Sequence, residues 1–104
     1  QCAVFDTCVQ DDTSGNVLMW SSTTGAYQYI VCGPTGSSMT GKGTVGLVNS
    51  IRTLTDSRSD RRMTATYNTA QKTGRATITL IPAPGISQSI TLSRTNPNAT
   101  CVCH

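Results

Sequence analysis

The feature that most constrains the fold is a strict alternation of apolar and hydroxyl-bearing residues in two neighbouring stretches, RRMTATYNT and RATITLI. Successive side chains of a β-strand point to opposite faces of the sheet, so a period of two indicates a strand with one buried face. The sequence therefore predicts an antiparallel hairpin with a threonine-lined outer face. Its inward positions are Met63, Ala65 and Tyr67 in the first stretch and Ala76, Ile78 and Leu80 in the second.

The composition favours strands along the whole chain. All five acidic residues are aspartates, so the good helix former glutamate is absent, while 29 of the 104 residues are threonine or serine. NVLMW and AYQYIVC form a second predicted hairpin, and in TVGLVN the side chains of Val45 and Leu47 are expected to point the same way. Residues 1–104 are therefore expected to form a single all-β domain, a small antiparallel β-barrel or sandwich stapled by disulfides.

Five cysteines in a chain of this length indicate an oxidising, extracellular setting; they are Cys2, Cys8, Cys32, Cys101 and Cys103. Cys101 and Cys103 are two residues apart and would face the same side of a strand, so they are badly placed to bond each other. One of the two is expected to bond the N-terminal pair and one to bond Cys32, with the exact pairing left open. One thiol remains over, which predicts an intermolecular bond and a covalent or tightly associated homodimer.

The chain is expected to be secreted, with its signal peptide already removed. No stretch approaches the roughly 20 apolar residues that a membrane span requires, so no membrane span is expected. The sequence Asn98-Ala99-Thr100 is a glycosylation sequon, which makes Asn98 a candidate glycan site.

Catalytic residues are not expected. The single histidine, His104, is the last residue given, and the five aspartates sit in turn-like contexts where carboxylates accept hydrogen bonds from nearby backbone. A weaker alternative is a small hydrolase that depends on Asp56, Asp60 or His104.

Two short motifs resemble cofactor sites without matching them. GSSMTGKG, residues 36–43, resembles a phosphate-binding loop, but Gly43 replaces the magnesium-ligating hydroxyl and a strand-like segment follows instead of a helix. The C-terminal CVCH has neither the haem-attachment spacing nor a set of four zinc ligands. We therefore expect no cofactor and no metal, and we interpret residues 36–43 as a flexible turn that leads into a strand.

The one charge cluster is RTLTDSRSDRR, which contains Arg52, Arg58, Arg61 and Arg62. It could bind a sulfated glycan, a nucleic acid or an acidic receptor face, but a solvated loop with internal ion pairs is the more usual outcome of such a run. No aromatic residues interleave the arginines, so nucleic acid is not expected as a partner. Trp20, next to Leu18 and Met19, is expected either in the core or on a contact surface.

Taken together, the start at QC, the end at ATCVCH and the threonine-rich middle DRRMTATYNTAQKTG resemble small secreted cysteine-rich proteins of ascomycete fungi. The resemblance is to the effector-like type secreted by root-colonising Trichoderma, similar in type to the larger Alternaria major-allergen family of β-barrel proteins. It implies a β-barrel, a dimer, a location in the plant apoplast and modulation of plant defence without catalysis. The expected function is therefore binding of a plant host protein or cell-wall component by a fungal effector or elicitor. The alternatives are a carbohydrate-binding module, an enzyme inhibitor, or an allergen-type surface protein with no host target.

Overall fold

The computed structural model describes residues 5–33, 36–80, 88–92, 94–95 and 101–103. They form two five-stranded antiparallel sheets, and the all-β expectation is confirmed. The first sheet has the strand order β10-β1-β2-β3-β4 and the second β5-β6-β7-β8-β9. The strands are β1 (Thr7–Gln10), β2 (Val17–Trp20), β3 (Ala26–Val31), β4 (Ser37–Lys42), β5 (Thr44–Val48), β6 (Ile51–Arg58), β7 (Arg61–Asn68), β8 (Thr73–Leu80), β9 (Gln88–Leu92) and β10 (Arg94–Thr95).

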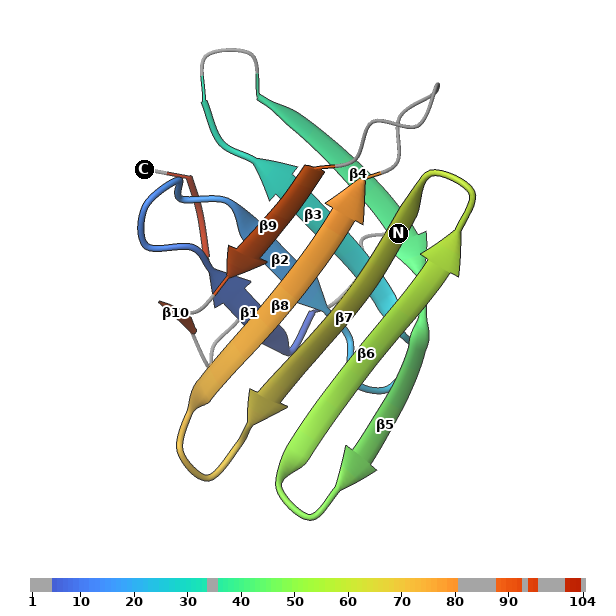
Figure 1. Ribbon diagram of the computed structural model, residues 1–104. Coiled ribbons are helices and arrows are strands. Elements are labelled where there is room, and N and C mark those ends of the chain that lie inside the picture. The colour runs from blue at the N-terminus through green and yellow to red at the C-terminus, as the bar shows by residue number, and fades with distance from the viewer. Residues whose placement is uncertain (1–4, 34–35, 81–87, 93, 96–100, 104) are drawn as a thin grey trace.

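The two sheets pack face to face. In Figure 1 the second sheet lies in front, and its strands cross those of the first sheet behind it. No described strand of one sheet pairs through backbone hydrogen bonds with a strand of the other, so the sheets do not close into a barrel and the sandwich alternative is correct. Both predicted hairpins are present, with Leu18 opposite Tyr29 between β2 and β3 and Ala65 opposite Ala76 between β7 and β8.

The core lies between the inner faces and follows the predicted alternation. Met63, Ala65 and Tyr67 are buried on β7 and alternate with exposed residues, as the sequence predicted. The alternation fails at Leu47, which is 67% exposed, because it lies at the end of the edge strand β5, next to the turn. The largest fully buried side chains of the first sheet are Leu18, Trp20, Tyr27 and Tyr29, and those of the second are Leu54 and Ile78.

Trp20 is part of this core. Its exposed fraction is 0%, so the alternative that placed it on a contact surface is wrong. The reason is its position on β2, where Leu18 and Trp20 share the inner face of the sheet. Burial of a large aromatic side chain of this kind is among the larger stabilising contributions to a small core.

The interpretation of residues 36–43 as a flexible turn is wrong. Most of the segment is strand β4, with Gly41 paired to Tyr27 of β3. A Cβ atom on Gly41 would lie 2.4 Å from the Tyr27 hydroxyl, so glycine makes room for the tyrosine ring. Gly43 then carries the chain from the first sheet to the second, where a Cβ atom would lie 2.5 Å from the carbonyl oxygen of Thr55. These glycines serve close packing.

Part of the outer face of the first sheet, around Cys8 and Val17, is covered by residues 101–103, which we call the C-terminal segment. Disulfides join Cys8 to Cys101 and Cys32 to Cys103, so Cys101 and Cys103 reach separate partners as expected. Gln10 Nε2 donates a hydrogen bond of 2.9 Å to the carbonyl oxygen of Val102, between the two bridges. Cys101 of this segment forms a small apolar cluster with Cys8 and Val17. Met19, Ile30 and Cys32 pack against this cluster.

Three residues singled out from the sequence, Cys2, Asn98 and His104, lie outside the described residues. The four other cysteines are paired, so Cys2 is the one cysteine of the sequence that the two bridges leave over.

Candidate functional site

The aspartates of the first sheet support turns, as the sequence predicted. Asp11 accepts hydrogen bonds from the backbone nitrogen and the hydroxyl of Ser14, and these bonds lower the pKa of its carboxyl. Asp6 accepts hydrogen bonds from Thr7 and Ser22. Partial burial acts to raise the Asp6 pKa, but these bonds and the charge of Arg52 together lower it. Carboxylates held in this way stabilise the turns in which they lie.

Asp56 differs from the expectation, because it lies within strand β6 and its side chain points between the sheets. It accepts a hydrogen bond from the Tyr27 hydroxyl and forms a 3.0 Å ion pair with Arg58. Arg61 Nη1 donates to the same Tyr27 hydroxyl at 3.0 Å and to the carbonyl oxygen of Thr40 at 3.2 Å. Desolvation, followed by the Asp56 hydrogen bond, raises the pKa of Tyr27.

This cluster of Tyr27, Asp56, Arg58 and Arg61, which we call the inter-sheet clasp, joins β3 of the first sheet to β6 and β7 of the second. Each charged member has a partner of opposite charge, since Arg61 also pairs with Asp60 at 3.0 Å. The Tyr27 hydroxyl donates to one neighbour and accepts from another. Because these groups bond one another across the gap between the sheets, the clasp links the two sheets.

The four arginines proposed as one anion-binding loop do not lie together. Residues 52–62 are not a loop but a hairpin, in which β6 runs to Arg58 and β7 begins at Arg61. Arg52 lies six residues along β6 from Arg58, about 20 Å away. Its guanidinium stacks 5.8 Å from the centre of the Tyr67 ring and donates to Thr7 Oγ1 at 3.0 Å. Arg61 is buried in the clasp, at 8% exposure.

Of the four arginines, Arg62 alone points to the outer face of the second sheet, and this face carries exposed hydroxyl side chains on several neighbouring strands. Strand pairing places Thr55, Thr64 and Thr77 next to one another on β6, β7 and β8. Pairing with Thr44 continues this row onto β5. The flanking rows are Thr53, Thr66 and Arg75 on one side and Ser57, Arg62 and Thr79 on the other.

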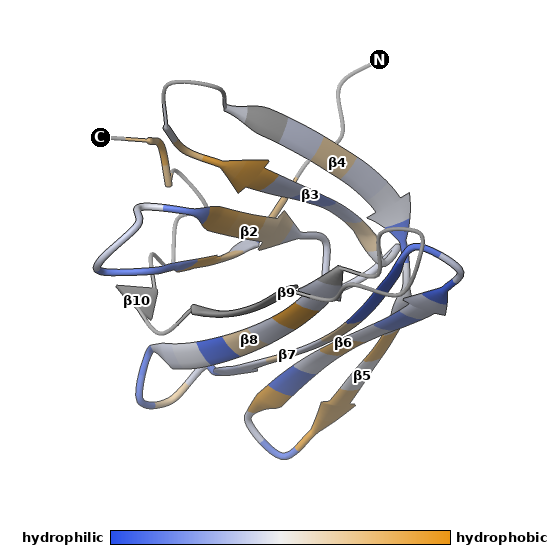
Figure 2. Cartoon of the chain, turned by 45° about the horizontal axis from the view of Figure 1, so that its top comes forward, coloured by the Kyte–Doolittle hydropathy of each residue, from blue (hydrophilic) through white to orange (hydrophobic). Residues whose placement is uncertain are grey.

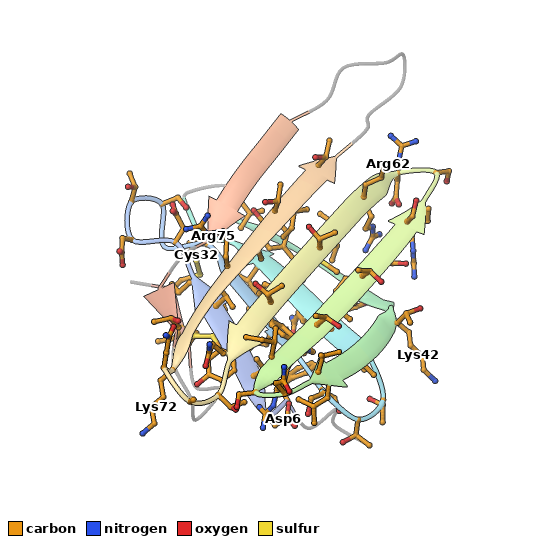
Figure 3. All side chains as sticks on the ribbon, turned by 60° about the horizontal axis from the view of Figure 1, so that its bottom comes forward. Asp6, Cys32, Lys42, Arg62, Lys72 and Arg75 are labelled. Carbon is orange, nitrogen blue, oxygen red and sulfur yellow. A yellow bond between two sulfur atoms is a disulfide. The ribbon has the colours of Figure 1, made fainter. Side chains whose placement is uncertain are left out.

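The outer face has two shallow depressions. One, of about 690 Å³, is lined by residues that include Lys42, Thr55, Thr64 and Arg62. The other, of about 510 Å³, lies toward the opposite end of β7 and is lined by residues that include Thr66, Asn68, Thr73 and Arg75. Figure 3 labels Arg62, Arg75 and Lys42 and shows Arg62 and Arg75 projecting from different parts of the second sheet.

The sequence predicted part of this face. The alternation of apolar and polar residues predicted a hydroxyl-lined outer side for β7 and β8. It did not predict the strand register that aligns the threonines of β6, β7 and β8. The signal was present as three Thr-x-Thr triplets, at residues 53–55, 64–66 and 77–79. Arg75 was also overlooked as a member of the site, because it is 13 positions from Arg62 in the sequence and only the β7–β8 pairing shows that both lie on the same face.

The chain matches no protein-family model, no curated protein and no solved structure. Among the described residues, no helix is long and apolar enough to cross a membrane, and no group of three or more histidine, cysteine or acidic side chains could hold a metal ion. The two disulfides are consistent with an extracellular protein.

Proposed function

We propose that this chain is a non-enzymatic, extracellular binding protein whose contact surface is the outer face of the second sheet. The observation that carries the proposal is the row of exposed threonines that strand pairing aligns across β5–β8, beside the two depressions. Such a face offers hydroxyl donors and acceptors together with methyl groups, at spacings set by the sheet.

The scaffold suits recognition because little of it has to become ordered when a ligand binds. Threonine is β-branched and has a restricted χ1, so its hydroxyl is held in place by the strand itself. The clasp and the two disulfides hold the sheets and the C-terminal segment together. A contact surface that is already in its bound arrangement loses less conformational entropy on binding.

The resemblance to secreted fungal proteins adds a biological setting to this proposal. The protein would be a fungal effector or elicitor that is secreted into the plant apoplast, and its partner a plant host protein or a cell-wall component. Binding through the threonine face would then modulate plant defence. Both the fungal source and the immune effect come from the resemblance alone.

Infiltration of the purified protein into leaves tests the proposal, with defence-gene transcripts as the readout. Thr64→Tyr places a bulky side chain in the middle of the face, at a strand position where tyrosine is favourable. Thr40→Tyr is the matched control, because Thr40 is an exposed strand threonine on the first sheet. We expect a response to the wild type and to Thr40→Tyr and its loss with Thr64→Tyr. An unchanged response to Thr64→Tyr would exclude the face.

Dimerisation would double this surface. The expected homodimer rests on the cysteine that the two bridges leave over, Cys2. Intact mass under non-reducing conditions tests the covalent form. A dimer mass that falls to the monomer mass on reduction, and that is absent in Cys2→Ser, would support it, whereas a monomer with one free thiol would count against it.

A further inference from the structure

The outer face of the second sheet has a charge pattern that selects among ligands. Arg62 and Arg75 are both exposed, and neither forms an ion pair with any described residue. Lys42 adds a third exposed positive charge at the rim of the first depression. The aspartates of the second sheet are already paired, Asp56 with Arg58 and Asp60 with Arg61. The face is therefore positive, and it favours an anionic ligand over a neutral one.

The spacing of the charges indicates an extended ligand. Arg62 lies beside Thr79, and Arg75 lies four residues back along β8, so their positions are about 13 Å apart along the strand. The positions between them carry hydroxyl side chains, Thr64, Thr66 and Thr77, all exposed. A ligand that engages both arginines must cross these hydroxyls, and so it must carry acidic groups separated by groups that form neutral hydrogen bonds.

Resting on the proposed function, we propose that the ligand is an acidic polysaccharide of the polyuronate type, a chain of sugar rings that carry carboxylates and free hydroxyls. Each arginine would hold one carboxylate through two parallel hydrogen bonds, the arrangement that a guanidinium makes best. The threonine rows would exchange hydrogen bonds with the ring hydroxyls between the two carboxylates.

Two other classes of polyanion fit the face less well. Three cations spread over a wide face fit a polymer with one charge per sugar ring better than a densely sulfated glycan, which would pair with clustered cations. A single-stranded nucleic acid stacks its bases on aromatic side chains. No described residue in the rows of the face is aromatic.

The test is calorimetric titration of the disulfide-bonded protein with polygalacturonate at low ionic strength and again at 0.15 M salt. Fully methyl-esterified polygalacturonate is the matched control ligand, because it keeps the backbone and loses the charge. Heparin serves as the densely sulfated comparison. Arg62→Gln, Arg75→Gln and the double variant remove charge from the face, while Arg58→Gln removes one charge from the same hairpin but on its inner side. Thermal unfolding confirms that each variant folds.

We expect binding of polygalacturonate that weakens at least threefold in each single variant and at least tenfold in the double variant, with Arg58→Gln within twofold of the wild type. Esterification should abolish binding, and heparin should bind no better than polygalacturonate. An effect of Arg58→Gln as large as that of Arg62→Gln would show a response to net charge alone and overturn the site. Equal binding of the esterified polymer, tighter binding of heparin, or no binding would overturn the ligand class.

These outcomes are separable from failure of the proposed function. If Thr64→Tyr abolishes the leaf response while polygalacturonate does not bind, the contact face stands and the polyuronate proposal is wrong. If Thr64→Tyr changes neither the leaf response nor polygalacturonate binding, both proposals are wrong.

Discussion

The two sheets have opposite outer faces. The outer face of the first sheet is apolar around Cys8, Val17 and Ile30, and the C-terminal segment covers this part of it and is fixed there by two disulfides. The outer face of the second sheet is formed by exposed threonines with two arginines, and no described element covers it. In Figure 2 apolar colour gathers on β2 and at the end of β3, whereas along β6–β8 it is interrupted by polar positions.

The contrast shows that the two outer faces of a small two-layer sandwich can meet solvent in different ways. An apolar outer face must be covered, because exposed apolar surface promotes association and aggregation. Here the cover is only three described residues long, so it has to be held covalently. A hydroxyl-bearing outer face needs no cover and stays available for a ligand.

The largest expected effect follows from removing that cover. Cys8→Ala with Cys101→Ala should lower the free energy of unfolding by about 2–5 kcal/mol and expose the apolar cluster. Cys32→Ala with Cys103→Ala should cost less, because Cys8 and Cys101 are buried at 0% and 6% exposure whereas Cys103 is exposed. Urea unfolding measures both losses, and binding of a hydrophobic dye reports the opened face. Equal losses would show that burial of the bridge does not matter.

A smaller effect is expected from the contact between the sheets. Tyr27→Phe keeps the ring against Gly41 but leaves Asp56 and Arg61 each without one hydrogen bond, at a cost of about 1–3 kcal/mol. Tyr29→Phe is the matched control, because its hydroxyl accepts a single bond, from Asn16 within the first sheet. Its loss should be smaller, about 1 kcal/mol. If Tyr29→Phe costs as much as Tyr27→Phe in urea unfolding, the clasp makes no special contribution.

The sequence predicted what is repetitive in this fold. The period of two at residues 61–68 and 73–80 depends only on local chemistry, and it placed Met63, Tyr67 and Ile78 on the inner face correctly. The cysteine spacing likewise excluded a bond between Cys101 and Cys103, because that argument needs only the geometry of a strand. Each of these predictions uses neighbours within a few residues.

What the sequence did not predict depends on contacts between distant segments. Gly41 was interpreted as part of a turn, but it lies in a strand, where its lack of a side chain leaves room for the ring of Tyr27 on the neighbouring strand. Asp56 was assigned to a turn, yet its partner Tyr27 is 29 residues away and in the other sheet. The threonine face depends on a register between three strands, which short motifs indicate only after the pairing is known.

The response to acid should test the aspartates that support turns beside the first sheet. Asp60, in the β6–β7 turn of the second sheet, also has a lowered pKa, because Arg61 donates hydrogen bonds to it. Asp6 and Asp11 have pKa values below their ordinary value of 3.8 in the folded protein, and both support the first sheet. A lowered pKa stabilises the fold at pH values above about 3.8, and this contribution is lost as the pH falls through the lowered values. The melting temperature should therefore fall below pH 4, by a modest amount because solvent screens these carboxylates. Asp6→Asn with Asp11→Asn should make that fall shallower; an unchanged profile would assign the acid sensitivity elsewhere.

The smallest expected effect on stability concerns the threonine face itself. Thr64→Val exchanges a hydroxyl for a methyl group of similar shape at an exposed position, so its free energy of unfolding should stay within about 0.5 kcal/mol of the wild type. Polygalacturonate binding should nevertheless weaken, because the hydroxyl in the centre of the row is lost. Thr40→Val on the first sheet is the control and should change neither quantity. A loss of stability in Thr64→Val with unchanged binding would show that the threonine rows stabilise the sheet and do not contact a ligand.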